Sequence, residues 1–140
     1  MAADLDEATL QALLQAAHAA RAQAYAPYSK YQVGAAVLDE HGRVHAGCNV
    51  ENAAYPQGLC AEGLALGAMV LAGGRRARAL LVVGEGPAPV TPCGGCRQKL
   101  REFGGDDTPV LIANGGGVQL RTTLGALLPH AFGPDHLEGA

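Results

Sequence analysis

The chain has 140 residues, of which 49% are hydrophobic and 16% are charged. This composition is typical of a globular protein and excludes a disordered chain. With 10 basic and 13 acidic side chains the net charge is −3, which argues against nucleic acid as the main partner and favours a small neutral ligand. We expect a single domain spanning residues 1–140, large enough to bury a core without disulfides.

The hydrophobic segments are short. No apolar run approaches the roughly 20 residues of a membrane span, so we expect no membrane partner. The first ten residues, MAADLDEATL, are acidic and lack the basic start of a secretory signal peptide. These features predict a cytoplasmic protein, in which four cysteines are more often metal ligands or free thiols than disulfides.

Apolar spacing and turn residues predict the helices and strands in chain order. Helically spaced leucine and alanine indicate a first helix over 4–24, which ends before Pro27. A hairpin follows, with strands over 33–38 and 43–50 and a turn closed by Gly42. The later elements are a helix over 60–72, a strand over 79–83, a helix over 94–103, strands over 109–113 and 118–120, and a helical turn over 124–128.

This order of elements predicts the fold class. A helix, a hairpin and then alternating helices and strands indicate an α/β protein with helices on both faces of a sheet. The sequence contains no internal repeat and no linker rich enough in flexible residues to divide it.

Three cysteines and one glutamate form the most informative motif. Cys60 and Glu62 stand in Cys-Ala-Glu, while Cys93 and Cys96 stand in Pro-Cys-Gly-Gly-Cys. Three thiolates favour zinc and leave the fourth tetrahedral position open to water, as in a catalytic zinc site. Both groups fall at predicted helix N-termini, where the helix dipole stabilises negative sulfur. Glu62 can stay off the metal and still exchange protons with that water.

Other interpretations of these residues remain open when each is taken alone. Cys48 could complete a closed structural site, but strand alternation separates it from Asn49 and Glu51, so we expect it to pack in the core. The CxxC pair alone is also consistent with structural zinc or free thiols. Asn49 and Glu51 alone are consistent with a solvent-exposed strand face, and Tyr31 with the packing of a loop.

The sequence resembles the small, homotetrameric, zinc-dependent cytidine deaminases. The matching segments cover most of the chain: APYSKY at 26–31, VGAAV at 33–37, GCNVENAAY at 47–55, CAE at 60–62, TPCGGCRQ at 91–98, and LLP at 127–129 with Phe132. A first ligand, a glutamate that is not a ligand and then PCxxC is the pattern of zinc deaminases. The resemblance implies a three-layer α-β-α sandwich with a mixed five-stranded sheet.

The resemblance also implies an activity. This is hydrolytic deamination of cytidine and deoxycytidine to uridine and deoxyuridine with release of ammonia, a step of pyrimidine salvage. It implies one Zn²⁺ per subunit on Cys60, Cys93 and Cys96, with Glu62 as the catalytic residue. The substrate-binding residues that it implies are Asn49 and Glu51 at the ribose hydroxyls, Ala61 at the base, Tyr31 stacked on the pyrimidine, and Tyr55 and Phe132 recruited from neighbouring subunits of a homotetramer with shared active sites.

Two positions depart from the family pattern: Tyr31 stands where the family usually has Phe, and position 63 differs beside the metal ligands. The family usually has Arg directly after Cys-Ala-Glu, where its charge offsets the thiolates, but this chain has Gly63. Arg97, which follows the last ligand, is the nearest substitute in sequence, and we expect it to compensate the charge. Gly63 and Tyr31 motivate a second hypothesis, the deamination of another aminopyrimidine nucleoside such as a blasticidin S-like antibiotic. A third is a non-enzymatic, zinc-stabilised binding module.

Overall fold

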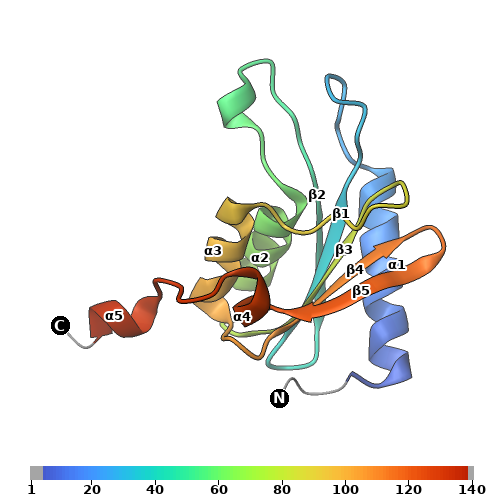
Figure 1. The fold of residues 1–140 in the computed structure, drawn as a ribbon. Helices are drawn as coiled ribbons and strands as arrows, with labels where there is room; N and C mark the ends of the chain where they lie inside the picture. Colours follow the sequence, from blue (N-terminus) through green and yellow to red (C-terminus); the bar gives the residue numbers. More distant parts are fainter. Residues whose placement is uncertain (1–4, 139–140) are drawn as a thin grey trace.

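A mixed sheet of five strands lies between two layers of helices (Figure 1). The computed structural model describes residues 5–138; the first four and last two residues of the expected domain over 1–140 lie outside this range. In chain order the elements are α1 (Glu7–Ala22), β1 (Gly34–Asp39), β2 (Val44–Cys48), the 3-10 helix η1 (Tyr55–Gln57), α2 (Ala61–Leu71), β3 (Ala77–Val83), α3 (Gly94–Phe103), β4 (Pro109–Asn114), β5 (Gly117–Thr123), α4 (Leu124–Leu127) and α5 (Pro134–Glu138).

The strand order in the sheet is β2-β1-β3-β4-β5. β1 runs antiparallel to both β2 and β3, and β4 runs antiparallel to β5. β3 and β4 are parallel, because α3 carries the chain back between them. The predicted α-β-α sandwich with a mixed five-stranded sheet is therefore confirmed.

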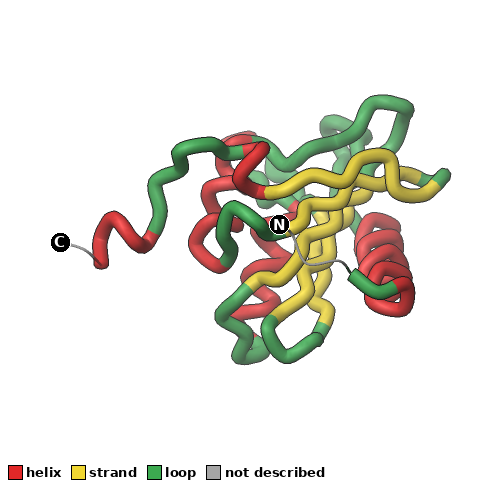
Figure 2. The backbone as a smooth tube through the Cα atoms, turned by 60° about the horizontal axis from the view of Figure 1, so that its bottom comes forward, coloured by secondary structure: helices red, strands yellow, loops and turns green. Residues whose placement is uncertain are grey.

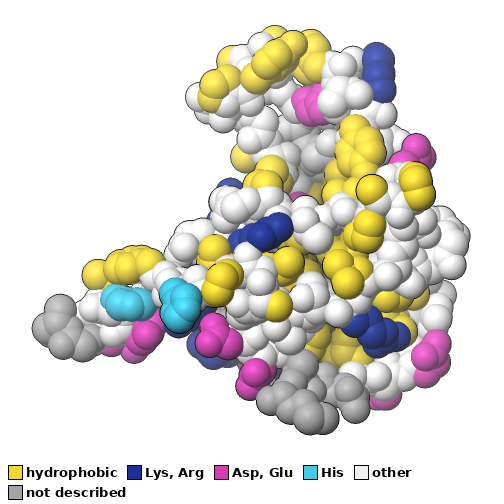
Figure 3. Space-filling view, viewed as in Figure 1, with side chains coloured by type: hydrophobic (Ala, Val, Ile, Leu, Met, Phe, Trp, Pro, Cys, Tyr) yellow, Lys and Arg dark blue, Asp and Glu magenta, His cyan; other side chains and the backbone are white. Residues whose placement is uncertain are grey.

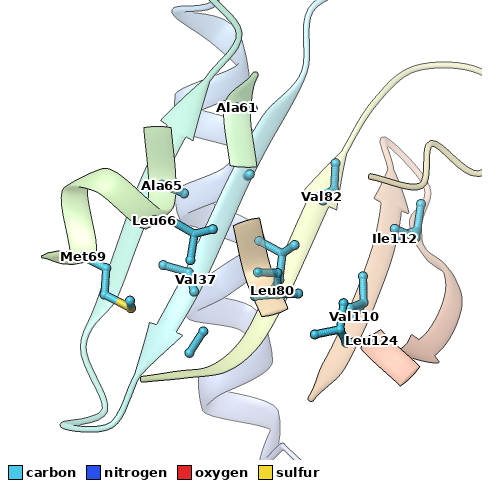
Figure 4. Close-up of a cluster of buried hydrophobic side chains, with 13 residues drawn as sticks. Val37, Ala61, Ala65, Leu66, Met69, Leu80, Val82, Val110, Ile112 and Leu124 are labelled. Atoms are coloured by element: carbon cyan, nitrogen blue, oxygen red, sulfur yellow. The ribbon is translucent and has the colours of Figure 1, made fainter. Parts of the chain in front are cut away.

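Side-chain alternation along the strands fills both faces of the sheet. On β3, Leu80 and Val82 point to the layer of α2 and α3, whereas Leu81 and Val83 point to α1. Figure 2 shows α1 alone on one face and the other helices across the sheet. The core on the α2 face is drawn in Figure 4, where residues of α2 such as Met69 lie over the strands. The chain thus has a core on each side of the sheet.

The first helix shows why its sequence folds as predicted. Its N-cap is Asp6, whose carboxylate accepts a 2.7 Å hydrogen bond from the Thr9 backbone N–H. The helix runs from 7 to 22 rather than over the predicted 4–24, and residue 4 lies outside the described range. It lies directly on β1 at Gly34, where a Cβ atom would come within 2.0 Å of the Ala17 carbonyl oxygen.

The structure differs from the prediction at two places that affect the site. β2 ends at Cys48, two residues before the predicted end, because Val50 pairs instead with Leu59 outside the sheet. The short α5 was not predicted, and it projects away from the body of the molecule (Figures 1 and 2). Within residues 5–138, no helix is both long and apolar enough to cross a membrane.

Candidate active site

The N-termini of α2 and α3 bring three cysteines together. Cys60 is the N-cap of α2, Cys93 is the N-cap of α3, and Cys96 lies in the first turn of α3. Their sulfur atoms all lie within 4.8 Å of one another. Three sulfurs at tetrahedral positions around zinc lie about 3.8 Å apart, given Zn–S bonds of about 2.3 Å. At most a small contraction would therefore be needed to bring the three thiols into zinc geometry.

Close contact with β2 fixes the start of α2. A Cβ atom at Gly47 would lie 2.5 Å from both the Ala61 carbonyl oxygen and the Ala65 backbone nitrogen. Only glycine at this position lets the first turn of the helix lie directly on the strand. The contact sets the height above the sheet of Cys60 and Glu62, the residues on either side of Ala61.

The electrostatics of the three thiols call for a cation. Burial raises the pKa of Cys60, and burial followed by the charge of Glu62 raises the pKa of Cys96. The pKa of Cys93 is lowered, chiefly by the backbone N–H of Cys96. Because each negative sulfur opposes ionisation of the others, three thiolates require a positive partner. A soft divalent cation such as Zn²⁺ fits this donor set.

Glu62 is a buried carboxyl group beside the thiols. Its exposed fraction is 6%, and it stands in the first turn of α2. Burial raises its pKa, while the positive charge of Lys99 acts in the opposite direction. A carboxyl group with a raised pKa exchanges protons more readily near neutral pH than an exposed one does.

A cavity of about 430 Å³ opens above the thiols. This volume lies within the usual range for small-molecule sites. In Figure 3 the upper part of the molecule, formed by the loops around η1 in Figure 1, overhangs a hollow in the surface. Eight of the predicted site residues line the cavity: Tyr31, Asn49, Glu51, Tyr55, Cys60, Ala61, Glu62 and Cys93. The structure thus brings these eight residues together from four segments of the chain.

Asn49 and Glu51 organise the loop that closes one side of this cavity. The Asn49 amide accepts from the Val33 backbone N–H at 2.9 Å and donates to the Tyr31 carbonyl oxygen at 2.8 Å. The Glu51 carboxylate accepts hydrogen bonds from the Tyr28 and Ser29 backbone N–H groups, at 2.9 and 3.1 Å, and also from the Ser29 hydroxyl. The Ser29 hydroxyl is the main cause of the lowered pKa of Glu51, which keeps this carboxylate ionised.

The remaining predicted residues lie outside the cavity lining. Arg97 donates from Nε to the Pro92 carbonyl oxygen at 2.6 Å and from one terminal nitrogen to the Leu127 carbonyl oxygen at 2.7 Å. These bonds join the start of α3 to α4. Phe132 belongs to the segment leading into α5, where it stacks on His136 with ring centroids 5.0 Å apart. Cys96 lies buried beneath the other two thiols.

Two groups of site residues were missed from the sequence. The lining also includes Val33, Val90 and Thr91, whose apolar or hydroxyl side chains gave no chemical reason to expect them at the site. Lys99, the second, lies beside Gly63. Helical spacing could have identified Lys99, since it follows Cys96 by three positions and so shares its side of α3.

Three clustered thiols and a buried carboxyl group beside one small cavity, on an α/β fold, are typical of metal-dependent hydrolytic enzymes. Comparison with known proteins makes this assignment specific. Residues 7–112 match the family model described as the cytidine and deoxycytidylate deaminase zinc-binding region. The chain therefore belongs to the cytidine and deoxycytidylate deaminase family.

Individual relatives resemble the chain along most of its length. A cytidine deaminase of Sporosarcina psychrophila is 44% identical over 131 residues, which cover 94% of this chain and 96% of the relative. A cytidine deaminase of Mycobacterium tuberculosis is 48% identical over 118 residues, covering 84% of this chain and 85% of the relative. The crystal structure of cytidine deaminase from Burkholderia pseudomallei superposes with a TM-score of 0.81 at 48% identity, covering 87% of this chain and 98% of that one.

Proposed function

We propose that this chain catalyses the zinc-dependent hydrolytic deamination of cytidine and deoxycytidine, giving uridine and deoxyuridine with release of ammonia. The observation that carries this proposal is the buried Glu62 carboxyl group, which lines the same cavity as Cys60 and Cys93 and lies beside the cluster of three thiols. The likeness to relatives named cytidine deaminase, along nearly the whole chain, supports this substrate.

The metal would be held by Cys60, Cys93 and Cys96, one Zn²⁺ per subunit. Bound zinc lowers the pKa of a coordinated water to about 7, which supplies a nucleophile at neutral pH. The two helix N-termini that carry the cysteines contribute positive partial charge to the thiolates. The sulfur spacing supports this ligand set.

Glu62 moves the protons of the reaction. Its carboxylate takes a proton from the attacking water and delivers it to the ring nitrogen N3 of the pyrimidine. The water oxygen adds at C4, and the carboxyl group then passes the second proton of the water to the exocyclic amine. The C4–N bond breaks and ammonia leaves, so the oxygen of water replaces nitrogen at C4. Burial of Glu62 supports this role, because a raised pKa eases both proton transfers.

Substrate binding follows from the cavity lining. The backbone of Ala61 would hold the base, and the exposed ring face of Tyr31 would stack on it. The side chains of Asn49 and Glu51 would accept hydrogen bonds from the sugar hydroxyls. An ionised carboxylate only accepts hydrogen bonds, which suits it to hydroxyl donors. Because both side chains already order the Tyr31 loop, the sugar would meet a prearranged surface.

The assembly proposed is a cytoplasmic homotetramer of single-domain chains that share active sites. Two large aromatic side chains support it, since Tyr55 is 73% exposed and Phe132 is 56% exposed in the isolated chain. Exposed aromatic groups of this kind are enriched in protein interfaces. Tyr55 also lines the cavity of its own chain, and both rings would reach the site of a neighbouring subunit. We propose no nucleic-acid or membrane partner.

A substrate panel tests the proposed function. Purified, zinc-loaded protein should remove the ultraviolet absorbance of cytidine and deoxycytidine and release ammonia in equal amount. Blasticidin S is the comparison substrate, because Gly63 departs from the family pattern beside the metal. A kcat/KM for blasticidin S at least tenfold above that for cytidine would replace the proposed substrate. Absence of deamination by protein with stoichiometric zinc would contradict the proposed substrate altogether.

A further inference from the structure

Lys99 of α3 lies where a side chain at position 63 would begin. A Cβ atom built on Gly63 would lie 3.5, 3.8 and 3.9 Å from Cδ, Cε and Nζ of Lys99. The aliphatic part of Lys99 therefore runs across the backbone of α2 at the residue that follows Glu62. Because Gly63 has no side chain, nothing from α2 competes for this space.

The packing of α3 against α2 places the exposed Lys99 side chain beside Gly63. Lys99 follows Cys96 by three residues, so both project from the same side of α3. Next to it, Leu100 is buried in the core shared with α2. The groove between the two helices, with a volume of about 530 Å³, is lined by Gly63, Leu66, Gly67, Val70, Gln98, Lys99, Glu102 and Phe103. Among these lining residues Lys99 is the cation, and it lies beside Gly63 in the first turn of α2.

The proposed zinc centre carries excess negative charge. Three thiolates and one Zn²⁺ sum to −1, and the nearby Glu62 carboxylate adds another negative charge. Arg97 does not relieve this through hydrogen bonds to sulfur, because its donors are directed at the Pro92 and Leu127 carbonyl oxygens and at the Thr91 hydroxyl. The charge of Lys99, in contrast, reaches Glu62.

We infer that Lys99 supplies the positive charge that offsets the thiolates of the zinc centre, and that the absence of a side chain at Gly63 gives Lys99 access to this position. The inference rests on the proposed zinc site. Lys99 is a positioning residue, since it lies outside both the sulfur cluster and the cavity lining. Its charge strengthens zinc binding and keeps the metal electrophilic although all three ligands are anionic.

Moving the charge tests the inference. Lys99→Met keeps the aliphatic chain and removes the charge, whereas Lys99→Arg keeps the charge. Lys99→Met combined with Gly63→Arg restores a positive charge on α2 in place of the one removed from α3. Arg78→Met is the matched control, because Arg78 is an exposed cation near the start of β3, far from the ligand-bearing helix ends. Zinc affinity is measured by competition with a chromogenic chelator at low and high salt, and kcat and KM are measured with cytidine.

We expect Lys99→Met to weaken zinc binding about tenfold at low salt, the lower end of the range for residues that support metal ligands. The loss of zinc affinity should be smaller in 1 M salt, where the screening length is about 3 Å. kcat should fall while the KM for cytidine changes little. Lys99→Arg and the double variant should both approach the wild-type zinc affinity, and Arg78→Met should match it.

The results separate this inference from the proposed function. If wild-type protein binds zinc and deaminates cytidine but Lys99→Met has the zinc affinity of Arg78→Met, only the role of Lys99 is contradicted. The same conclusion follows if Lys99→Met binds zinc weakly but neither Lys99→Arg nor the double variant regains the wild-type zinc affinity. If wild-type protein binds no zinc, both proposals fail together.

Discussion

The hydroxyl of Tyr31 donates a 3.0 Å hydrogen bond to the backbone carbonyl oxygen of Glu85. This bond joins the loop before β1 to the loop after β3, two segments that lie on either side of the cavity. The bond anchors the far end of the Tyr31 side chain, which lines the cavity and is 36% exposed. The hydroxyl fits because Gly84 has no side chain; a Cβ there would lie 2.8 Å from it.

Replacing Tyr31 with Phe should release the loop after β3. The lost hydrogen bond should cost about 1 kcal/mol of unfolding free energy. We expect the KM for cytidine to rise several-fold with kcat nearly unchanged, because the ring still stacks but one wall is less ordered. Steady-state kinetics and urea unfolding check this result. Tyr25→Phe is the control, since Tyr25 does not line the cavity; equal effects of the two changes would contradict the role of the Tyr31 hydroxyl.

Replacing Glu62 with Gln should separate catalysis from metal binding. The amide cannot carry protons between water and base, so kcat should fall at least a hundredfold, in line with general acid–base contributions of about 10²–10⁴. Zinc content should be unchanged, because Glu62 lies outside the sulfur cluster. Glu7→Gln is matched to it, as Glu7 also stands in the first turn of a helix. Retention of more than a tenth of kcat would count against the proton-transfer role.

Replacing Gly47 with Ala should disturb the site through the contact between β2 and the first turn of α2. The new Cβ, 2.5 Å from backbone atoms of α2, must push the helix away from β2. Overpacking of this kind typically costs about 1–3 kcal/mol, and it should also lower zinc affinity by displacing Cys60. Thermal unfolding and zinc titration test both effects. Gly105→Ala should change neither, because a Cβ there has no neighbour within 4 Å.

Stability below pH 4 should depend on Asp39, the buried acid at the end of β1. Burial tends to raise the pKa of Asp39, but hydrogen bonds from His45, from the Arg43 backbone and guanidinium, and from the His41 backbone hold it well below the ordinary value of 3.8. A pKa lowered in the folded state stabilises the fold above the unfolded pKa, and this stabilisation is lost as the pH falls through the folded pKa.

The variant Asp39→Asn should therefore cost about 2 kcal/mol at pH 7, because Asp39 is the shared partner of His45 and Arg43. The difference between variant and wild type in the free energy of unfolding should become steadily smaller as the pH falls from 4 to 2. Urea unfolding at several pH values, with zinc removed from both proteins by chelator, measures it. Asp106→Asn is the control, because Asp106 is exposed. A difference that stays constant over this range would show that folding does not lower the pKa of Asp39.

The sequence predicted the site better where local signals determine the backbone. Cys60 and Cys93 were placed at helix starts, and both are N-caps in the structure, because Pro92 and the apolar run after Cys60 are local signals. The end of β2 was predicted two residues too late, since Val50 has strand character but pairs with Leu59 instead.

Partners distant in sequence could not be predicted. The Tyr31 hydroxyl meets a carbonyl group 54 positions away, and no pattern around Tyr31 indicates which segment will lie there. The same limit applies to α5, whose ion pair between Arg101 and Asp135 at 2.9 Å joins residues 34 apart. A helix of five residues gains little from intrinsic propensity, so its position depends on such distant contacts.

The placement of ligands at the starts of two separate helices has a thermodynamic consequence. Cys60 and Cys93 are 33 positions apart, so a metal held by both closes a loop that contains all of α2 and β3. If that closure acts like a covalent cross-link, it restricts the unfolded chain by about 3–4 kcal/mol. Chelation would then act first on the interface between α2 and α3, and amide hydrogen exchange there should accelerate before the edge strand β5 is affected.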